Sequence, residues 1–312
     1  MSGPEPRPPV RFPRDPNVTE RIVPPPPGTY VGTAPGKVIV VGEHAVVYGH
    51  RAVAAAVDLY TRVTLRDRSG PSEIEGTDVW DARLPDALAT LVPPEGVGVS
   101  IESELPVGCG LGSSAALAVA MVRAVAAREG RVATTAECVE RGFGVERVFH
   151  GNPSGLDHTV SAMGCPVIFR RGERPSPLQL ARPLRLVVAN TGTAGNTAEM
   201  VAKVAKRRPE AELLRLGAIT EMVAARLRRG DDIGPFIQEA HWLLRRIGVS
   251  TRELDELCRA MEAAGARGAK LAGAGGGGVA IALVDESHEG SVRQAAEALA
   301  GGQVYSVTIC GA

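Results

Sequence analysis

The sequence has little of several features that would point to whole classes of protein. Five cysteines occur in 312 residues, with no Cys-x-x-Cys pair, which argues against a disulfide scaffold and against a zinc or dithiol site. Neither charge is in excess, since 35 lysines and arginines balance 35 aspartates and glutamates. That balance provides no overall field to hold nucleic acid or an anionic membrane. No segment reads as a signal peptide or a transmembrane helix. We therefore expect a cytoplasmic protein that binds neither nucleic acid nor membrane.

What is present suits a globular protein with a substantial core. Apolar residues make up 44% of the chain and charged residues 22%. The exception is residues 1–28, whose prolines and charges, including four consecutive prolines, predict a disordered leader. A Pro/Arg-rich link near residue 183 predicts a division into domains at 29–183 and 184–312.

Strand and helix patterns are mixed along both predicted domains. Short runs rich in β-branched residues predict strands, and longer apolar periodicities with capping residues predict helices. The strands are expected at 30–41, 52–58, 60–66, 186–189, 270–271, 279–284 and 304–309. The helices are expected at 112–128, 134–150, 154–162, 195–208, 211–229, 233–247, 251–265 and 291–299.

Residues 106–115 form a glycine-rich loop that leads into the apolar helix 112–128. Glycines allow backbone N–H groups to approach a ligand closely, and a helix N-terminus favours an anion, so the pattern is typical of a phosphate site. The alternative is a tight turn with Ser113 or Ser114 as an ordinary helix cap. The loop is not a Walker A motif, because no Gly-Lys-Ser/Thr ends it.

A second glycine-rich stretch follows Lys270. Five of the six residues 273–278 are glycine, and ordering them costs much backbone entropy. Close approach to a phosphate or a substrate would explain them, and a flexible hairpin connection is the alternative.

Polar residues flank the apolar run 38–41. Lys37 precedes it and Glu43 and His44 follow it. Taken alone, Lys37 reads as a solvated surface charge and His44 as a structural histidine.

Two carboxylates occur on neighbouring predicted helices. Glu146 falls on the same helical stripe as Val139 and Phe143, where a carboxylate is costly unless it meets a metal or another cation. Asp157 has a structural alternative, since Ser154-x-x-Asp157 resembles a capping box.

These segments occur in one order over residues 34–278, and together they resemble the motifs of the GHMP kinase family of small-molecule kinases. Residues 42–49 resemble the mevalonate kinases of that family more than its galactokinases, and residues 150–157 are also very similar to the mevalonate kinase version. Cys109 and the pair Gly164-Cys165 depart from the usual pattern without removing a reactive group.

The resemblance implies an α+β fold with an N-terminal α/β domain, a C-terminal ferredoxin-like domain and the active site between them. It implies that ATP and Mg²⁺ are used to phosphorylate the primary hydroxyl of mevalonate, in isoprenoid precursor synthesis. A kinase for phosphomevalonate, galactose or homoserine is the alternative within the family. A catalytically inactive ligand sensor is the alternative outside enzymes. Mevalonate and ATP are then the expected partners, with a homodimer as one option for assembly.

The resemblance also assigns roles. Asp157 and Lys37 would be catalytic, and Ser114 and Glu146 would hold Mg²⁺. The residues expected to bind ATP are Gly108, Gly110, Leu111, Gly112, Ser113, Ser114, Gly275 and Gly276. The residues expected to bind the substrate are Glu43, His44, His150, Thr197, Gly273 and Ala274.

Overall fold

The computed structural model describes residues 26–78, 81–108, 110–151 and 153–311. The predicted leader lies outside the described residues except for its last three, and so does Cys109. Within these ranges, no helix is long and apolar enough to cross a membrane.

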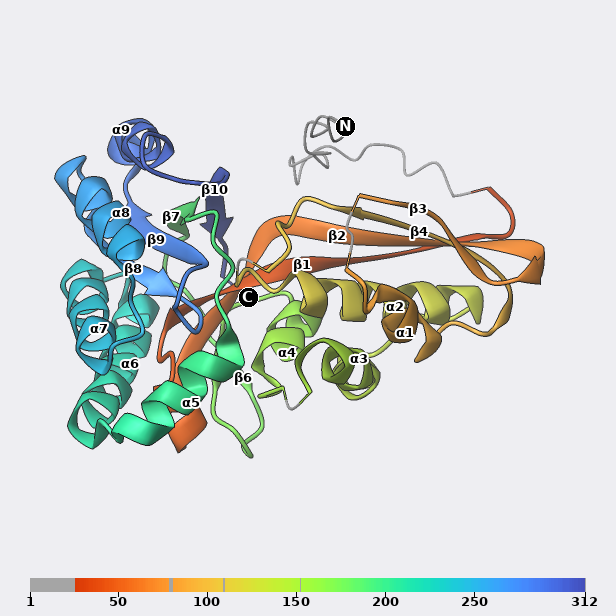
Figure 1. The fold of residues 1–312 in the computed structure, drawn as a ribbon, viewed down its shortest axis with the longest axis horizontal. Coiled ribbons are helices and arrows are strands. Elements are labelled where there is room, and N and C mark those ends of the chain that lie inside the picture. Colours follow the sequence, from red (N-terminus) through yellow and green to blue (C-terminus); the bar gives the residue numbers. More distant parts are fainter. Residues whose placement is uncertain (1–25, 79–80, 109, 152, 312) are drawn as a thin grey trace.

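The first half of the chain is built on two long antiparallel strands. These are β1 (Thr29–Val41) and β2 (Ala52–Pro71), which run along most of the length of the molecule (Figure 1). The two strands predicted at 52–58 and 60–66 are one continuous strand. The sheet has the order β3-β4-β2-β5-β6, with β1 on β2. Its other strands are β3 (Glu73–Thr77), β4 (Glu95–Ser103), β5 (Val167–Phe169) and β6 (Ser176–Pro177).

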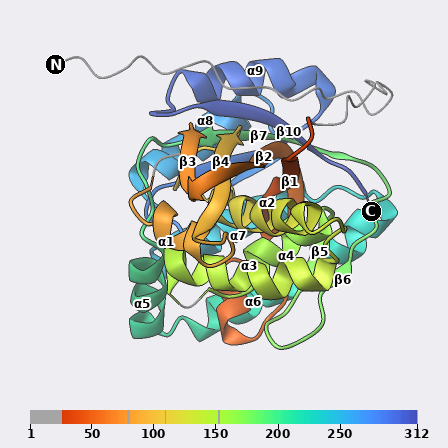
Figure 2. The same cartoon turned by 90° about the vertical axis from the view of Figure 1, so that its right-hand side faces the viewer.

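Helices cover one face of this sheet, as Figures 1 and 2 show. They are α1 (Leu84–Ala89), α2 (Ser113–Arg128), α3 (Thr135–His150) and α4 (Leu156–Met163). Eleven of the sixteen residues of α2 are buried, as its apolar composition predicts. The helix lies so close to β1 that a side chain at Gly32 would meet the backbone of α2. The sheet thus fixes where the N-terminus of α2 points.

The second half has the topology of a ferredoxin-like domain. Its sheet has the order β10-β7-β9-β8, with all neighbours antiparallel. These strands alternate with helices in the βαββαβ pattern, so the predicted fold class is confirmed. The strands are β7 (Leu184–Asn190), β8 (Gly268–Ala272), β9 (Val279–Val284) and β10 (Val304–Ile309).

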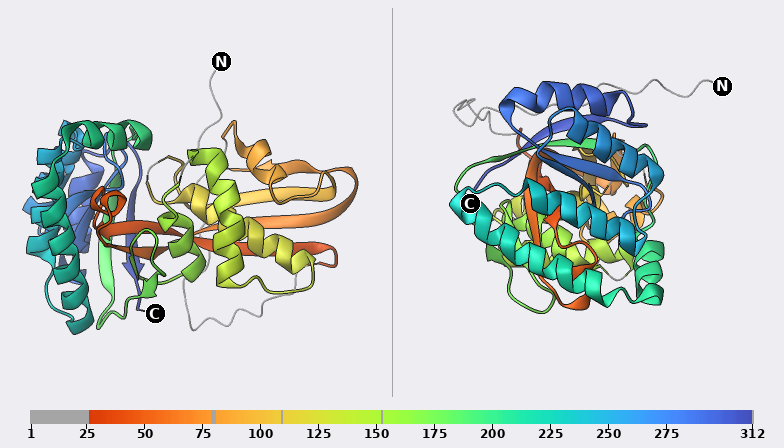
Figure 3. Two further views of the ribbon diagram at one scale, coloured as in Figure 1. Left: turned by 90° about the horizontal axis from the view of Figure 1, so that it is seen from below. Right: turned by 90° about the vertical axis from the view of Figure 1, so that its left-hand side faces the viewer.

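Helices cover the outer face of the second sheet, seen in front of it on the right of Figure 3. They are α7 (Gly234–Ile247), α8 (Arg252–Ala263) and α9 (Glu286–Glu297). Helix α6 (Glu210–Arg229) packs on α7 and on the strands β1 and β2 of the first sheet, and α5 (Thr197–Arg207) lies nearer the first half (Figure 1). Helix α9 begins five residues before the predicted start at 291, because Asp285 and Glu286 supply the N-terminal acidic residues that the apolar pattern does not reveal.

The two sheets share one hydrophobic core. Val38, Val40 and Val53 of the first sheet belong to the same buried cluster as Leu186 and Ile281 of the second. A hydrogen bond also joins the sheets, since the N–H of Thr308 in β10 donates to Oδ1 of Asp58 in β2 at 3.0 Å. The predicted division at residue 183 falls where one sheet gives way to the other, and as a domain boundary it stays a prediction.

The close contact at Gly32 gives a stability prediction. A Cβ at this position would lie 2.1 Å from the carbonyl oxygen of Ala120 and 2.4 Å from the nitrogen of Ala124. We expect Gly32→Ala to lower the free energy of unfolding by about 3 kcal/mol, the upper end for overpacking. The matched control is Gly144→Ala on the exposed face of α3, where nothing lies within 4 Å. That change should stabilise by about 0.5–1 kcal/mol. Urea unfolding of both variants measures the difference, and equal effects would contradict it.

Candidate active site

Lys37 is a charged residue in the strand β1, and yet it is buried. Its side chain is 4% exposed and extends from β1 to two partners on other segments. The ammonium group donates to the carbonyl oxygen of Gly110 at 3.0 Å and lies 3.1 Å from Oδ2 of Asp157. The alternative of a solvated surface charge is therefore excluded. Residues 37, 110 and 157, far apart in sequence, meet at one point.

The first glycine loop is fixed to β1 beside this lysine. The N–H of Lys37 donates to the carbonyl oxygen of Leu111 at 2.8 Å. Gly112 has a φ of 75°, and a Cβ there would lie 2.7 Å from Cγ of Lys37. Only glycine therefore allows the loop to pass the lysine stem this closely.

The alternative in which Ser113 or Ser114 caps α2 is wrong. The N-cap residue is Gly112, and no side chain among the described residues caps this end of the helix. Ser113 and Ser114 instead lie within the first turn. The N–H groups at the start of α2 thus remain for a ligand, as the phosphate-site interpretation requires.

Glu146 is the buried carboxylate of the site. It is 2% exposed, and its Oε1 has no hydrogen-bond partner among the described residues. Burial, and then the charge of Asp157, raise its pKa to about 7, while a hydrogen bond from Ser114 and the charge of Lys37 act in the opposite direction. The predicted grouping of Glu146 with Val139 and Phe143 on one buried stripe of the helix is off by one position. Glu146 shares the buried side of α3 with Gly142 and Phe149, whereas Phe143 is exposed.

His150 lies on the outer side of Ser114. Its Nε2 is 3.0 Å from the Ser114 hydroxyl. Desolvation lowers the pKa of His150; the carboxylates of Asp157 and Asp81 oppose this, and the charges of Arg83 and Lys37 add to it. The neutral ring can then donate to the serine oxygen, which leaves the hydroxyl proton for Glu146. His150, Ser114 and Glu146 thus form a polar chain of side chains, in which the serine hydroxyl stands between the imidazole and the carboxylate.

Arg83 borders this chain and was not predicted from the sequence. Its guanidinium pairs with Asp81 at 2.6 Å and donates to the carbonyl oxygen of Phe149, also at 2.6 Å. The pKa of Asp81 falls to about 2 because Arg83 hydrogen-bonds to it. Arg83 thereby anchors the C-terminal end of α3, where Glu146 and His150 lie. Helix α1 is too short for a periodic pattern, so the sequence offered no signal.

Asp157 is not a helix cap. The N-cap residue of α4 is Gly155, with a φ of 89°, and the Ser154 hydroxyl accepts from the N–H of Leu156 at 3.2 Å. The predicted capping box is thus wrong. The Asp157 side chain, 34% exposed, turns instead to Lys37. It can contact both that ammonium group and a ligand.

His44 lies in a strained turn. Its φ is 57° and its ψ −46°, and the N–H of Ala45 donates to the carbonyl oxygen of Glu43 at 2.6 Å. This is a γ-turn of the rare, strained form. The imidazole Nε2 donates to the carbonyl oxygen of Ala274 at 2.8 Å, and burial lowers the ring's pKa. Glu43 is fully buried and pairs with Lys270 of β8. In this conformation the Glu43 carboxylate therefore faces Lys270, and its described link to the predicted site is through the neighbouring residue His44.

The second glycine loop connects β8 to β9 and packs against protein backbone. The N–H of Gly276 is donated to the carbonyl oxygen of Val249 at 2.8 Å, and a Cβ at Gly275 would lie 2.1 Å from that same oxygen. The hairpin interpretation therefore explains these two glycines, and the N–H of Gly276 is not available to a phosphate in this conformation.

The two glycine loops face each other. A Cβ at Gly273 would lie 3.9 Å from Cα of Gly110, and one at Gly108 would lie 3.7 Å from Cβ of Ala194. The loop that ends with Thr197 packs on the second glycine loop through Gly195. Thr197 itself is exposed at the first residue of α5. It lies on the side of the second loop and has no described contact with Lys37 or Asp157.

The arrangement brings one ammonium group, two carboxylates and a serine hydroxyl to the N-terminus of a helix. No group of three or more metal-binding side chains occurs in the part of the chain that the structure describes. A metal bound here would need further oxygen ligands from a bound molecule.

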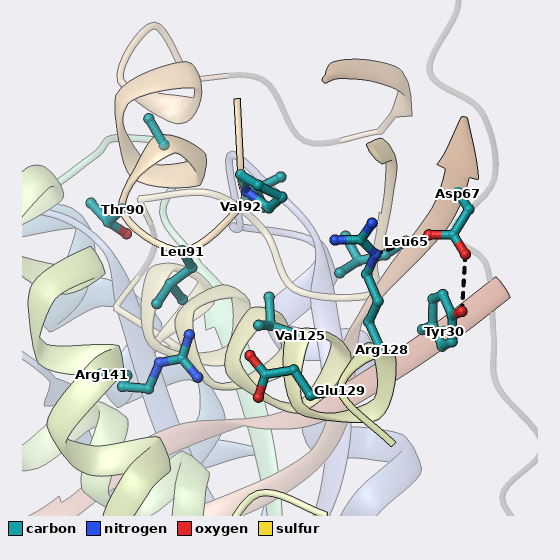
Figure 4. A pocket seen from close by; sticks show the side chains of 12 residues that line it. Tyr30, Leu65, Asp67, Thr90, Leu91, Val92, Val125, Arg128, Glu129 and Arg141 are labelled. Carbon is teal, nitrogen blue, oxygen red and sulfur yellow. Dashed lines mark hydrogen bonds and ion pairs between the residues drawn. The ribbon is translucent and has the colours of Figure 1, made fainter. Parts of the chain in front are cut away.

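A cavity of about 590 Å³ lies elsewhere, at the opposite end of α2 (Figure 4). Val125, Arg128 and Glu129 line it, roughly 18 to 24 Å along the helix from its start. None of its lining residues belongs to the predicted site.

The buried charge of Glu146 predicts a pH-dependent effect on stability. Because its pKa is raised in the folded protein, its ionisation destabilises the fold as pH rises from about 4.5 through about 7. In the metal-free protein, Glu146→Gln should therefore stabilise at pH 8, by up to about 3 kcal/mol, and change little at pH 5. The control is Glu140→Gln on the exposed side of α3, which should change the free energy of unfolding little at either pH. Urea unfolding at both pH values decides, and a gain at pH 5 equal to that at pH 8 would refute the account.

Comparisons with known proteins identify the family of the chain. The model for the GHMP kinases N terminal domain matches residues 81–165, and that for GHMP kinases C terminal matches residues 222–301. A mevalonate kinase of Thermococcus gammatolerans is 36% identical over 304 residues, covering 82% of this chain and 89% of that protein. One of Pyrococcus abyssi is 36% identical over 322 residues, covering 88% and 94%.

A crystal structure of L. major mevalonate kinase in complex with R-mevalonate has the same fold. The TM-score is 0.82 at 28% sequence identity, and the alignment covers 91% of this chain and 96% of that one. Both halves of the sequence are thus matched, and the chain belongs to the GHMP kinase family.

Proposed function

We propose that this chain is a mevalonate kinase, which transfers the γ-phosphoryl group of ATP to the primary hydroxyl of mevalonate. The observation that carries the proposal is the meeting of Lys37, Asp157 and the first glycine loop at one point. Relatives that are 36% identical over most of the chain are mevalonate kinases, which supports the choice of substrate.

The phosphates of ATP would lie on the first glycine loop, at the uncapped start of α2. Gly108, Gly110, Leu111, Gly112 and Ser113 would hold them through backbone N–H groups and the helix dipole. The second loop lies opposite, where Gly273 and Ala274 have more freedom to contact a ligand than Gly275 and Gly276, which pack on Val249.

Ser114 and Glu146 fit Mg²⁺. Both offer oxygen atoms, and Oε1 of Glu146 is buried without a partner among the described residues. Mg²⁺ commonly takes one or two protein ligands and completes its shell with water and substrate phosphates. When bound, the ion would neutralise phosphate charge. His150 would orient the serine oxygen from behind.

Asp157 and Lys37 would act on the acceptor. The hydroxyl oxygen forms a bond to the γ-phosphorus as the bond from that phosphorus to the bridging oxygen of ADP breaks. The hydroxyl proton passes to the carboxylate of Asp157. The ammonium group of Lys37, 3.1 Å from that carboxylate, stabilises the negative charge that develops on the oxygens.

The acceptor itself would lie between the His44 turn and the second glycine loop. The hydrogen bond from His44 to Ala274 closes this side of the site. Thr197 would contribute from the start of α5. A sensor without activity is disfavoured, since Lys37, Ser114, Glu146 and Asp157 are all present and gathered together.

A panel of acceptors tests the substrate. With ATP and Mg²⁺, kcat/KM should be highest for mevalonate and lower by orders of magnitude for phosphomevalonate, galactose and homoserine. The physical reason is that a site shaped for one set of hydroxyl and carboxylate groups leaves its polar groups unpaired with another. An equal or higher kcat/KM for any of the other three would assign the chain to a different branch of the family.

Replacing Asp157 tests the mechanism. Asp157→Asn keeps the side-chain shape but removes the proton acceptor, so kcat should fall by about 10²–10⁴-fold while the dissociation constant for ATP changes little. The melting temperature should fall, because the buried ammonium group of Lys37 keeps its bond to Gly110 but loses its ion pair, so kcat is compared at a temperature where both proteins are folded. The matched control is Asp86→Asn, an aspartate in the first turn of α1 that should leave kcat unaltered. A near-normal kcat for Asp157→Asn would exclude it as the base.

A further inference from the structure

Two charged side chains are buried together where the two sheets meet. Glu43 follows β1 and is 1% exposed, and Lys270 lies within β8 and is fully buried. They form an ion pair, and Oε2 of Glu43 has no partner among the described residues. Such a pair adds little stability compared with apolar residues of the same size, because both charges lose their hydration. A role other than stability is therefore the better explanation.

The same two segments are joined a second time. His44, next to Glu43, donates to the carbonyl oxygen of Ala274, four residues after Lys270. His44 is also the centre of the strained γ-turn. A strained turn persists only where its surroundings hold it on several sides. Glu43 supplies one of these restraints and His44 the other.

Lys270 is itself held from the opposite side. The next residue, Leu271, donates its N–H to Nδ1 of His241 at 3.3 Å, and Nε2 of that ring lies 3.2 Å from Asp255. Asp255 also pairs with Arg245 at 2.8 Å. The strand that carries Lys270 is thus fixed to α7 and α8, and provides a rigid anchor for the turn.

We propose that Glu43 and Lys270 are positioning residues, whose ion pair holds the His44 turn against the second glycine loop and so sets the acceptor side of the site. No described contact joins either side chain to Lys37 or Asp157, so both would act through the turn. The choice of mevalonate as test substrate rests on the proposed function, whereas the restraint on the turn is a property of the fold.

The test uses two variants that avoid a lone buried charge. Glu43→Asp keeps both charges but withdraws the carboxylate from Lys270. The double variant Glu43→Met/Lys270→Met replaces both charged side chains by apolar ones of similar size and should keep a melting temperature near that of the wild type. Both should lower kcat/KM for mevalonate by about 10–100-fold, through misplacement of the acceptor, while KM for ATP stays within about threefold.

Amide hydrogen exchange gives a second readout that needs no substrate. In both variants the N–H groups of Ala45, Val46 and Val47, which are bonded within the turn, should exchange faster than in the wild type. The control is Val292→Ala in α9, a fully buried residue of the same core, which should lower the melting temperature without changing either readout.

The outcomes separate the two proposals. A double variant with wild-type kcat/KM and wild-type exchange in the turn would overturn the positioning role and leave the pair as charge compensation alone. A wild-type protein that phosphorylates another acceptor would overturn the proposed substrate. The exchange data, and kcat/KM for that other acceptor, would still decide the role of the pair.

Discussion

The ammonium group of Lys37 must reach Gly110 and Asp157 at once while its stem runs past the first glycine loop. That requirement explains several features that are otherwise unrelated. Position 112 is glycine because the lysine stem occupies the space that a side chain would need. The N-cap of α4 is Gly155, and the carboxylate of Asp157 therefore points to the amine of Lys37 and not to the end of the helix. The long strand β1 carries Lys37 to this point through the core.

The site is held together by arrangements that do not favour stability. Glu146 is a buried carboxylate whose Oε1 has no partner in the described part of the chain, and His44 occupies a backbone conformation that non-glycine residues rarely adopt. Their cost is offset elsewhere, mainly by the apolar helix α2 and by the large buried cluster that spans both sheets. Strain at a site and tight packing around it are commonly found together.

Much of this could be predicted from the sequence because glycine loops, apolar runs and helix caps are local signals. The start of α3, predicted at residue 134, is correct: Thr134 is the N-cap residue, and its hydroxyl accepts from the N–H of Glu137. The serine caps were wrong because glycine took the cap position at both α2 and α4. The strands β3 and β4 were missed because they are short or interrupted by Gly96 and Gly98.

The partners of the buried charges could not be predicted, because a single sequence does not tell which distant segments meet. Glu43 and Lys270 are 227 positions apart. A lysine inside an otherwise apolar strand was the one local sign that Lys270 needed a partner. The roles assigned to individual site residues by resemblance stay predictions until the variants above are measured.

The continuous core has a consequence for how the two halves behave when separated. Val38, Val40 and Val53 bury their side chains in the same cluster as Leu186 and Ile281 of the second sheet. Either half expressed alone would expose that surface to water and tend to aggregate. The intact chain should accordingly melt in a single cooperative transition, in which calorimetric and van't Hoff enthalpies agree. A hinge that separated the two sheets would expose this cluster to water and is therefore disfavoured.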